Sequence, residues 1–438
     1  MTIDARALTY FAIMAGMLLV VGFFQSWNVS LSILNLCLIS AIMALGVNIQ
    51  WGYAGLFNAG IMGFAALGGL AAVVVSMPAV PEAISAGGGL IVLSFGIAAL
   101  TIALAVVAYK KLPNTKMRSA LIVAIIVVGY FATRYFFVPG TAAVEAVEPA
   151  RTGYLGGLGL PVVFSWLVGG AFAGIAAWLI GKITLGLRSD YLAIATLGIS
   201  EIIVAIIKNE DWMSRGVKNV IGIPRPVPYE IDLQQSEWFQ NLAANLGADV
   251  VTFSSVFVKL CYAGLFTIVL LICIWLAQRA LNSPWGRMMR AIRDNEVSAN
   301  AMGKDVTGRH LQVFVLGTII VGIAGAMLTT LDGQLTPSSY QPLRFTFLVW
   351  VMVIVGGSGN NWGAVLGGFL VWFFWTEAPI VGLWALEVIT SPLAEDNALR
   401  LHLLDSAAFM RLITMGVLLL VVLRFSPRGL LPEKSARR

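Results

Sequence analysis

The sequence predicts an all-α, polytopic membrane helix bundle with about 10–12 transmembrane segments, some short or broken, in a single domain over residues 1–438. Hydrophobic residues make up 59% of the chain and charged residues only 11%. Runs of about 20 apolar residues, the length that crosses a bilayer, recur along its whole length. Most runs are apolar on all sides, whereas helices around a soluble core would be amphipathic.

Twelve candidate spans follow from these runs. Two pairs nearly abut, at Gln50–Gly52 and at Gly356–Asn361, so each pair is either two crossings or a broken, partly re-entrant segment. The first span is expected to be a retained helix rather than a signal peptide, since no small-residue cleavage motif follows it. The spans are Leu8–Phe24, Val29–Ile49, Tyr53–Ser76, Leu90–Ala108, Ala120–Val138, Pro161–Ile180, Tyr191–Ile207, Val256–Ala277, Leu311–Leu331, Leu343–Val355, Trp362–Trp375 and Phe409–Leu423.

The basic residues are distributed by side of the membrane. If the N-terminus is cytoplasmic and the spans alternate, 18 of the 28 Lys and Arg residues face inward. The reverse orientation would invert this bias, against the positive-inside rule. Both termini are therefore predicted to be cytoplasmic. Because the net charge of +6 is not pooled in a patch with exposed aromatics, no nucleic-acid partner is expected.

The segment 282–307 is the longest basic, polar stretch between two strongly apolar runs, and it is predicted to be a cytoplasmic loop. Its apolar residues from Trp285 to Ile292 fall at helical spacing, with three arginines on a different arc. This pattern predicts a short amphipathic helix, a turn, and a small-residue stretch closed by Gly303. A partner protein that grips this surface and an interfacial helix on anionic lipid explain the composition equally well.

Two stretches are predicted to lie on the opposite side. Residues 208–255 form a long periplasmic loop with a Pro-rich turn and an amphipathic patch. A second outer stretch, Glu377–Ser406, carries both acids and apolar residues. Together they are either a docking rim for something arriving from outside or plain loops and interfacial helices.

The chain shows no enzymatic signature. Neither Gly181–Lys182 nor Gly303–Lys304 belongs to a phosphate-binding loop, so ATP, if it is used, must be bound by another chain. The three cysteines lie within apolar spans and the two histidines are far apart, so no disulfide framework and no metal site are expected. No cofactor is expected in this chain.

Four polar side chains lie in or beside apolar spans and are candidates for a substrate pathway. Glu201 lies about halfway along Tyr191–Ile207, where a charge is costly unless it faces protein or a wet cavity. It either lines a pathway or fastens one helix to another. Asn35, Asn48 and Asn58 are first of all candidates for hydrogen bonds between helices, and second for ligand contacts.

Four stretches, in order along the chain, carry a resemblance to a known family. Together they resemble the permease subunits of bacterial branched-chain amino acid ABC importers, in particular the LivM branch. The stretches are Leu34–Phe57 with its Gly-Tyr-Ala-Gly motif, Leu187–Ile202, Gly286–Gly303 with the segment through Ala326 that follows, and Val353–Gly368 with the closing Phe425–Leu431.

The resemblance implies a multi-pass protein of the bacterial inner membrane with four kinds of partner. These are the membrane lipid, a second LivH-like permease, two cytoplasmic ATP-binding subunits, and a periplasmic substrate-binding protein. It places Glu201 on the family's Gly-Glu-Ile segment, here Ser200-Glu201-Ile202. It assigns ATPase coupling to six residues that match the family's inner loop: Arg287, Arg290, Arg293, Glu296, Ala299 and Gly303.

The chain departs from the family pattern in two places. Where members often carry His or Gln after the Gly-Tyr-Ala-Gly motif, this chain reads Asn58-Ala-Gly-Ile61. The region 79–138, with two extra spans, occurs only in longer members. Related permeases serve urea, short amides or other amino acids, so the exact substrate stays open. A stand-alone secondary carrier and a non-transporting scaffold are the competing classes of function.

Overall fold

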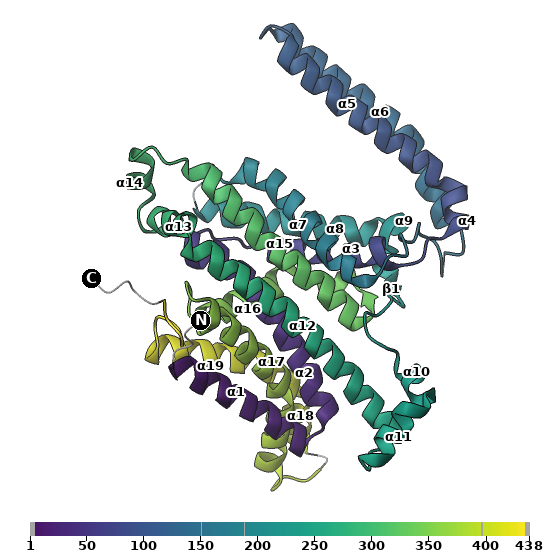
Figure 1. Ribbon diagram of the computed structural model, residues 1–438. Coiled ribbons are helices and arrows are strands. Elements are labelled where there is room, and N and C mark those ends of the chain that lie inside the picture. The colour runs from purple at the N-terminus through teal and green to yellow at the C-terminus, as the bar shows by residue number, and fades with distance from the viewer. Residues whose placement is uncertain (1–4, 150, 188, 396, 434–438) are drawn as a thin grey trace.

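The computed structural model describes residues 5–149, 151–187, 189–395 and 397–433, and it is a bundle of long helices (Figure 1). Ten helical segments of this described part are long and apolar enough to cross a membrane. Two shorter apolar helices, α3 (Ile61–Ser76) and α16 (Pro342–Gly356), complete the bundle. The prediction of an all-α membrane bundle with about 10–12 segments is therefore confirmed.

The other elements follow the chain in a simple order. The spanning helices are α1 (Ala5–Phe24), α2 (Trp27–Val47), α5 (Gly89–Lys111), α6 (Lys116–Glu145), α7 (Val162–Thr184), α8 (Ser189–Asn209), α12 (Val250–Asn282), α15 (Val306–Asp332), α17 (Asn361–Thr390) and α19 (Met410–Phe425). The short elements are α4 (Pro81–Ala83), α9 (Asp211–Ser214), β1 (Val220–Ile221), α10 (Glu230–Gln235), α11 (Glu237–Asn245), α13 (Pro284–Asp294), α14 (Glu296–Ala301), β2 (Gln334–Leu335) and α18 (Ala398–Asp405).

The two ends of the bundle differ. The start of α1, the end of α19 and the α13–α14 elbow lie toward one end, whereas α10, α11 and α18 lie toward the other (Figure 1). At that second end the residues predicted as a long loop, 208–255, contain five short elements and the start of α12, and β1 pairs antiparallel with β2. We call the α13–α14 end the inner end and the other the outer end. Which side of the membrane each faces stays a prediction from charge.

The helix α15 forms the centre of the bundle and packs most extensively against α7 and α3. Small residues permit this close approach. A methyl group on Gly68 of α3 would overlap the carbonyl of Gly322 on α15, and one on Gly322 would in turn overlap α7. Helices that are solvated by lipid associate through such backbone-level packing, because hydrophobic burial no longer distinguishes helix from lipid.

Each of the two closely spaced pairs of spans consists of a long helix and a short helix joined by a non-helical break. α2 runs on through a π-helical turn, Asn48–Gly52, and the chain is then irregular from Gly55 to Gly60 before α3 begins. The span predicted to start at Tyr53 is thus wrong at its start. At the second break α16, only about 22 Å long, turns into α17 through Gly357, whose φ of 115° is a conformation that favours glycine.

The prediction that the span after this second break ends at Trp375 is also wrong. α17 continues to Thr390 although it contains Pro379, and it carries Glu377 inside the bundle rather than in an outer loop. Glu377 is buried, and its carboxylate accepts a hydrogen bond of 2.7 Å from the side chain of Gln25. Glu377 and Pro379 together are typical of a loop. The helix can nevertheless continue within the bundle, because the buried carboxylate has a polar partner there.

The helices α5 and α6 form a hairpin that stands apart from the bundle (Figure 1). They pack mainly on each other, and nearly all of their apolar side chains are exposed on the surface of the chain. The two ends of the hairpin are joined at the outer end, where the Val80 amide donates a 3.1 Å hydrogen bond to the Leu155 carbonyl. The hairpin accounts for the two extra spans of the region 79–138.

We expect Gly68→Val to destabilise the protein strongly, because the added side chain has to displace backbone of α15. Overpacking of this kind costs about 1–3 kcal/mol or more. The measurement is the midpoint of thermal unfolding of the detergent-solubilised protein. The matched control is Gly96→Val on α5, where nothing lies within 4 Å of the added group. Equal midpoints for the two variants would contradict the packing described here.

Candidate coupling elbow and outer pocket

At the inner end, α13 and α14 form a helical elbow as the sequence pattern predicts. α13 begins after Ser283 with Pro284 at its first turn, and it turns Met289 and Ile292 into the bundle. α14 begins where the Asn295 side chain accepts a hydrogen bond of 2.9 Å from the Ser298 amide. The Asn295 amide also donates to the Ala291 carbonyl at the end of α13, so this one residue caps both helices and fixes the bend between them.

The exposed surface of the elbow combines charged and apolar side chains. Arg287, Glu296 and Gly303 are exposed and Ala299 is partly exposed. Val297 and Met302 are 81% and 78% exposed, which is unusual for apolar side chains outside the hydrocarbon layer. A surface cleft of about 700 Å³ lies between the two helices. Its lining includes Trp285, Met288, Ala299, Met302, Lys304 and Arg309.

Two of the predicted coupling arginines face the bundle instead. Arg290 donates to the Leu281 carbonyl at 3.3 Å. Arg293 forms a 2.9 Å ion pair with Glu433 of the C-terminal tail and also donates to the carbonyl of Gly52. Burial alone would lower the pKa of Arg293, but the carboxylates of Glu433 and Asp294 outweigh it and raise the pKa. The elbow is thus tied to the break after α2.

Side-chain amides connect this break to the neighbouring elements. The Asn48 amide donates to Asn361 at 3.1 Å, and its oxygen accepts from the Gly359 amide at 2.8 Å. The Asn58 amide donates to Gln50 at 3.1 Å, and Gln50 in turn donates to the Phe314 carbonyl at 2.9 Å. This amide network joins both breaks to α15, and it occupies the polar atoms of Asn48 and Asn58.

Asn35 and Glu201 lie elsewhere. Asn35 is fully buried and donates to the Lys259 carbonyl of α12 at 3.0 Å. Glu201 lies on the exposed face of α8, next to Ile202, which is 58% exposed. The four pathway candidates are therefore not brought together. Two belong to the amide network, one fastens α2 to α12, and Glu201 points away from the bundle.

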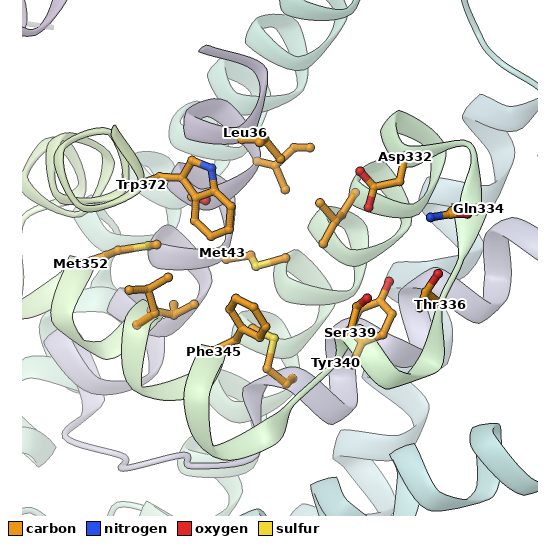
Figure 2. Close-up of a pocket in the computed structure, with 16 residues that line it drawn as sticks. Leu36, Met43, Asp332, Gln334, Thr336, Ser339, Tyr340, Phe345, Met352 and Trp372 are labelled. Carbon is orange, nitrogen blue, oxygen red and sulfur yellow. The ribbon is translucent and has the colours of Figure 1, made fainter. Parts of the chain in front are cut away.

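A partly open pocket of about 290 Å³ lies among α2, α3, α15, α16 and α17 in the outer half of the bundle (Figure 2). Its polar side comes from the segment between α15 and α16, and its apolar side from the helices. The polar lining residues are Ser40, Asp332, Gln334, Thr336, Ser339 and Tyr340, and the apolar ones are Leu36, Ile39, Met43, Met62, Leu328, Phe345, Leu348, Val349, Met352 and Trp372.

The residues of the amide network, the elbow–tail contact and the pocket are only weakly indicated by the sequence. Gln50 was visible only as part of a junction between two spans, and Glu433 only as one residue of a charged tail. Asp332 ends an apolar run and precedes a glycine, which is a common pattern for a helix end. The contacts of Arg293 and the convergence on the pocket depend on residues far apart in the chain, so composition and spacing could not show them.

Comparison with known proteins identifies the family. The family model described as branched-chain amino acid transport system, permease component, matches residues 131–423. The probable branched-chain amino acid transport permease LivM of Methanocaldococcus jannaschii is 28% identical over 36% of this chain and 42% of its own length. The high-affinity branched-chain amino acid permease LivM of Escherichia coli is 24% identical over 39% of this chain and 40% of its own.

A further relative has a different printed substrate. The fructose import permease FrcC of Rhizobium meliloti is 28% identical over 25% of this chain and 32% of its own length. The chain thus spans between 32% and 42% of the curated relatives that it matches here. No solved structure matches. Because the family model covers well over half of its residues, the chain belongs to the permease component family of branched-chain amino acid transport systems.

Proposed function

We propose that this multi-pass membrane protein is the LivM-type permease subunit of an ABC importer that moves branched-chain amino acids across the bacterial inner membrane. Two separate cytoplasmic subunits bind and hydrolyse ATP, so the chain itself needs no cofactor. A LivH-like permease is its partner in the membrane, and a periplasmic binding protein delivers the substrate. The names of the two LivM relatives support the substrate class.

The elbow is the observation that carries the proposal. Val297 and Met302 are exposed on a capped, rigid bend that also carries Arg287 and Glu296. An apolar centre with charged neighbours is typical of a protein–protein contact. A lipid-facing interfacial helix would instead turn its apolar stripe outward, whereas α13 buries Met289 and Ile292 against the bundle. These features support docking of an ATP-binding subunit on the elbow.

The contacts of Arg293 supply a route from the docking surface to the membrane interior. Arg293 lies on the bundle-facing side of the elbow and bonds the Gly52 carbonyl at the end of the π turn. Asn48, four residues earlier, holds the turn between α16 and α17. A rigid-body shift of the elbow would therefore displace the break after α2 and the break between α16 and α17 together. Alternating access requires a coupled motion of this kind.

The position of Glu201 supports a second membrane subunit. A carboxylate about midway along a spanning helix and exposed to lipid would cost about 2.5–3.5 kcal/mol. Among the described residues, none forms an ion pair with Glu201. We place the second permease, or a water-filled path between the two permeases, against this face of α8. Gly198 leaves room there for close approach, since nothing lies within 4 Å of its position.

We expect Val297→Glu to abolish ATP-driven uptake, because a charge at the centre of the docking surface prevents the ATP-binding subunit from seating. The measurement is uptake of labelled leucine by vesicles that contain the full complex, with a fall of at least about tenfold. The matched control is Met117→Glu at the tip of the α5–α6 hairpin, where Met117 is 81% exposed. Normal uptake with Val297→Glu would defeat the docking surface. Leucine uptake by the purified chain alone under an ion gradient would show a secondary carrier instead.

We expect Arg293→Ala and Glu433→Gln to uncouple the complex rather than to disassemble it. Either change breaks the link between elbow and tail while leaving Val297 and Met302 exposed, so the ATP-binding subunits still copurify but leucine uptake falls. Hydrogen exchange of the backbone amides at 430–433 should speed up in both variants. The control is Arg424→Ala, an exposed arginine near the same tail. Unchanged exchange and uptake in both variants would show that the link has no role in transmission.

A further inference from the structure

The pocket in the outer half of the bundle has the form of a ligand site (Figure 2). Its volume of about 290 Å³ is close to the lower limit of small-molecule sites, about 300 Å³, and suits a compound of few heavy atoms. We propose that it binds a compact aliphatic compound that carries a primary ammonium group, with the aliphatic part among the methionines and the ammonium at Asp332. This inference rests on the proposed transport function and names the residues that would meet the substrate inside this subunit.

The apolar side of the pocket fits aliphatic groups of more than one shape. Met43, Met62 and Met352 come from three different helices and converge there, together with Leu348 and Val349. Methionine side chains are flexible and polarisable, so they adapt to branched aliphatic groups of slightly different outline. Removing an aliphatic side chain from water into such a lining contributes about 0.8 kcal/mol per methylene.

The polar side selects a positive charge. The residues that line the pocket include one carboxylate, Asp332, and no Lys, Arg or His. Asp332 is exposed at the polar side of the pocket and has no ion-pair partner within the described part of the chain. The nearby Tyr340 hydroxyl is already engaged with Thr329 at 2.7 Å. Arg344, one residue before Phe345, is exposed and stacks over the Trp375 ring at 5.1 Å, and it is not part of the lining.

Two buried polar atoms complete the site. Trp372 and Thr336 both line the pocket, and the indole nitrogen of the one and the hydroxyl of the other are buried without a hydrogen-bond partner among the residues described. Leaving buried donors and acceptors unpaired costs about 1–3 kcal/mol each, so such atoms usually serve a ligand or water. They offer contacts to the part of the ligand that is neither ammonium nor hydrocarbon, such as the carboxylate of an amino acid.

The location of the pocket connects it to the inner elbow. Met43 lies on α2 five residues before Asn48, and Met62 lies at the start of α3, directly after the irregular segment. The floor of the pocket is therefore made from the two helices that flank the break held by Arg293. A shift of the break changes the floor, so docking and ATP use at the inner end can alter affinity in the outer half.

The test measures binding without ATP and without the periplasmic binding protein. The full membrane complex, in lipid nanodiscs, is titrated with leucine, isopentylamine or isovalerate while tryptophan fluorescence is followed, since Trp372 lines the pocket. We expect leucine and isopentylamine to saturate the signal and isovalerate to fail. Isovalerate binding as tightly as isopentylamine, or no saturable signal with leucine, would overturn the assignment.

Variants separate this assignment from the transport function. Asp332→Asn should weaken leucine and isopentylamine binding about tenfold or more, because a charge-assisted hydrogen bond is lost, and it should raise the KM for leucine uptake. Glu82→Gln, at an exposed glutamate of α4, is the matched control and should change neither quantity. If Asp332→Asn binds and transports like the unaltered complex, the pocket assignment fails while the transport function stands. If the unaltered complex binds leucine but never transports it, the transport function fails instead.

Discussion

Unwound backbone inside a membrane has to be hydrogen-bonded by protein, and the rest of this structure depends on how the break after α2 meets that requirement. Three side chains bond its irregular backbone: Asn58 accepts from the Gly60 amide, Thr196 accepts from the Ala59 amide, and the Trp350 indole donates to the Asn58 carbonyl. The side-chain amides of Asn48 and Gln50 connect the same break to the turn before α17 and to α15, so the position of one break is fixed relative to the other. A continuous helix would need none of these partners and would offer no connection between the ends of the bundle.

The break connects the two proposed sites, the coupling elbow and the outer pocket, through α2 and α3. On the inner side the end of the π turn bonds Arg293 of the elbow, and on the outer side α2 and α3 contribute methionines to the pocket. Elsewhere the bundle is packed through glycines at backbone contact, as between Gly68 and Gly322, and has little freedom to deform. We therefore expect movement to be concentrated at the breaks, because side-chain hydrogen bonds rather than close backbone packing hold these segments.

Much of the fold could be predicted from the sequence because lipid imposes length and polarity on each span. The elbow was also predictable, since the spacing of Trp285 to Ile292 is local. Two kinds of feature could not be predicted. Glu377 and Pro379 are typical of a loop, and only the contact with Gln25 shows why the helix continues. Arg293 and Glu433 are 140 positions apart, so their ion pair cannot be inferred from local spacing.

The hairpin of α5 and α6 leaves and re-enters the bundle at nearly the same point, where Val80 bonds Leu155. Neither the pocket nor the elbow includes a residue between these two positions. An ancestor with a short linker there could have acquired the hairpin in one step without refolding the rest. The architecture thus behaves as a modular scaffold, and the rim beside Val80 is a natural point for grafting or excising membrane segments.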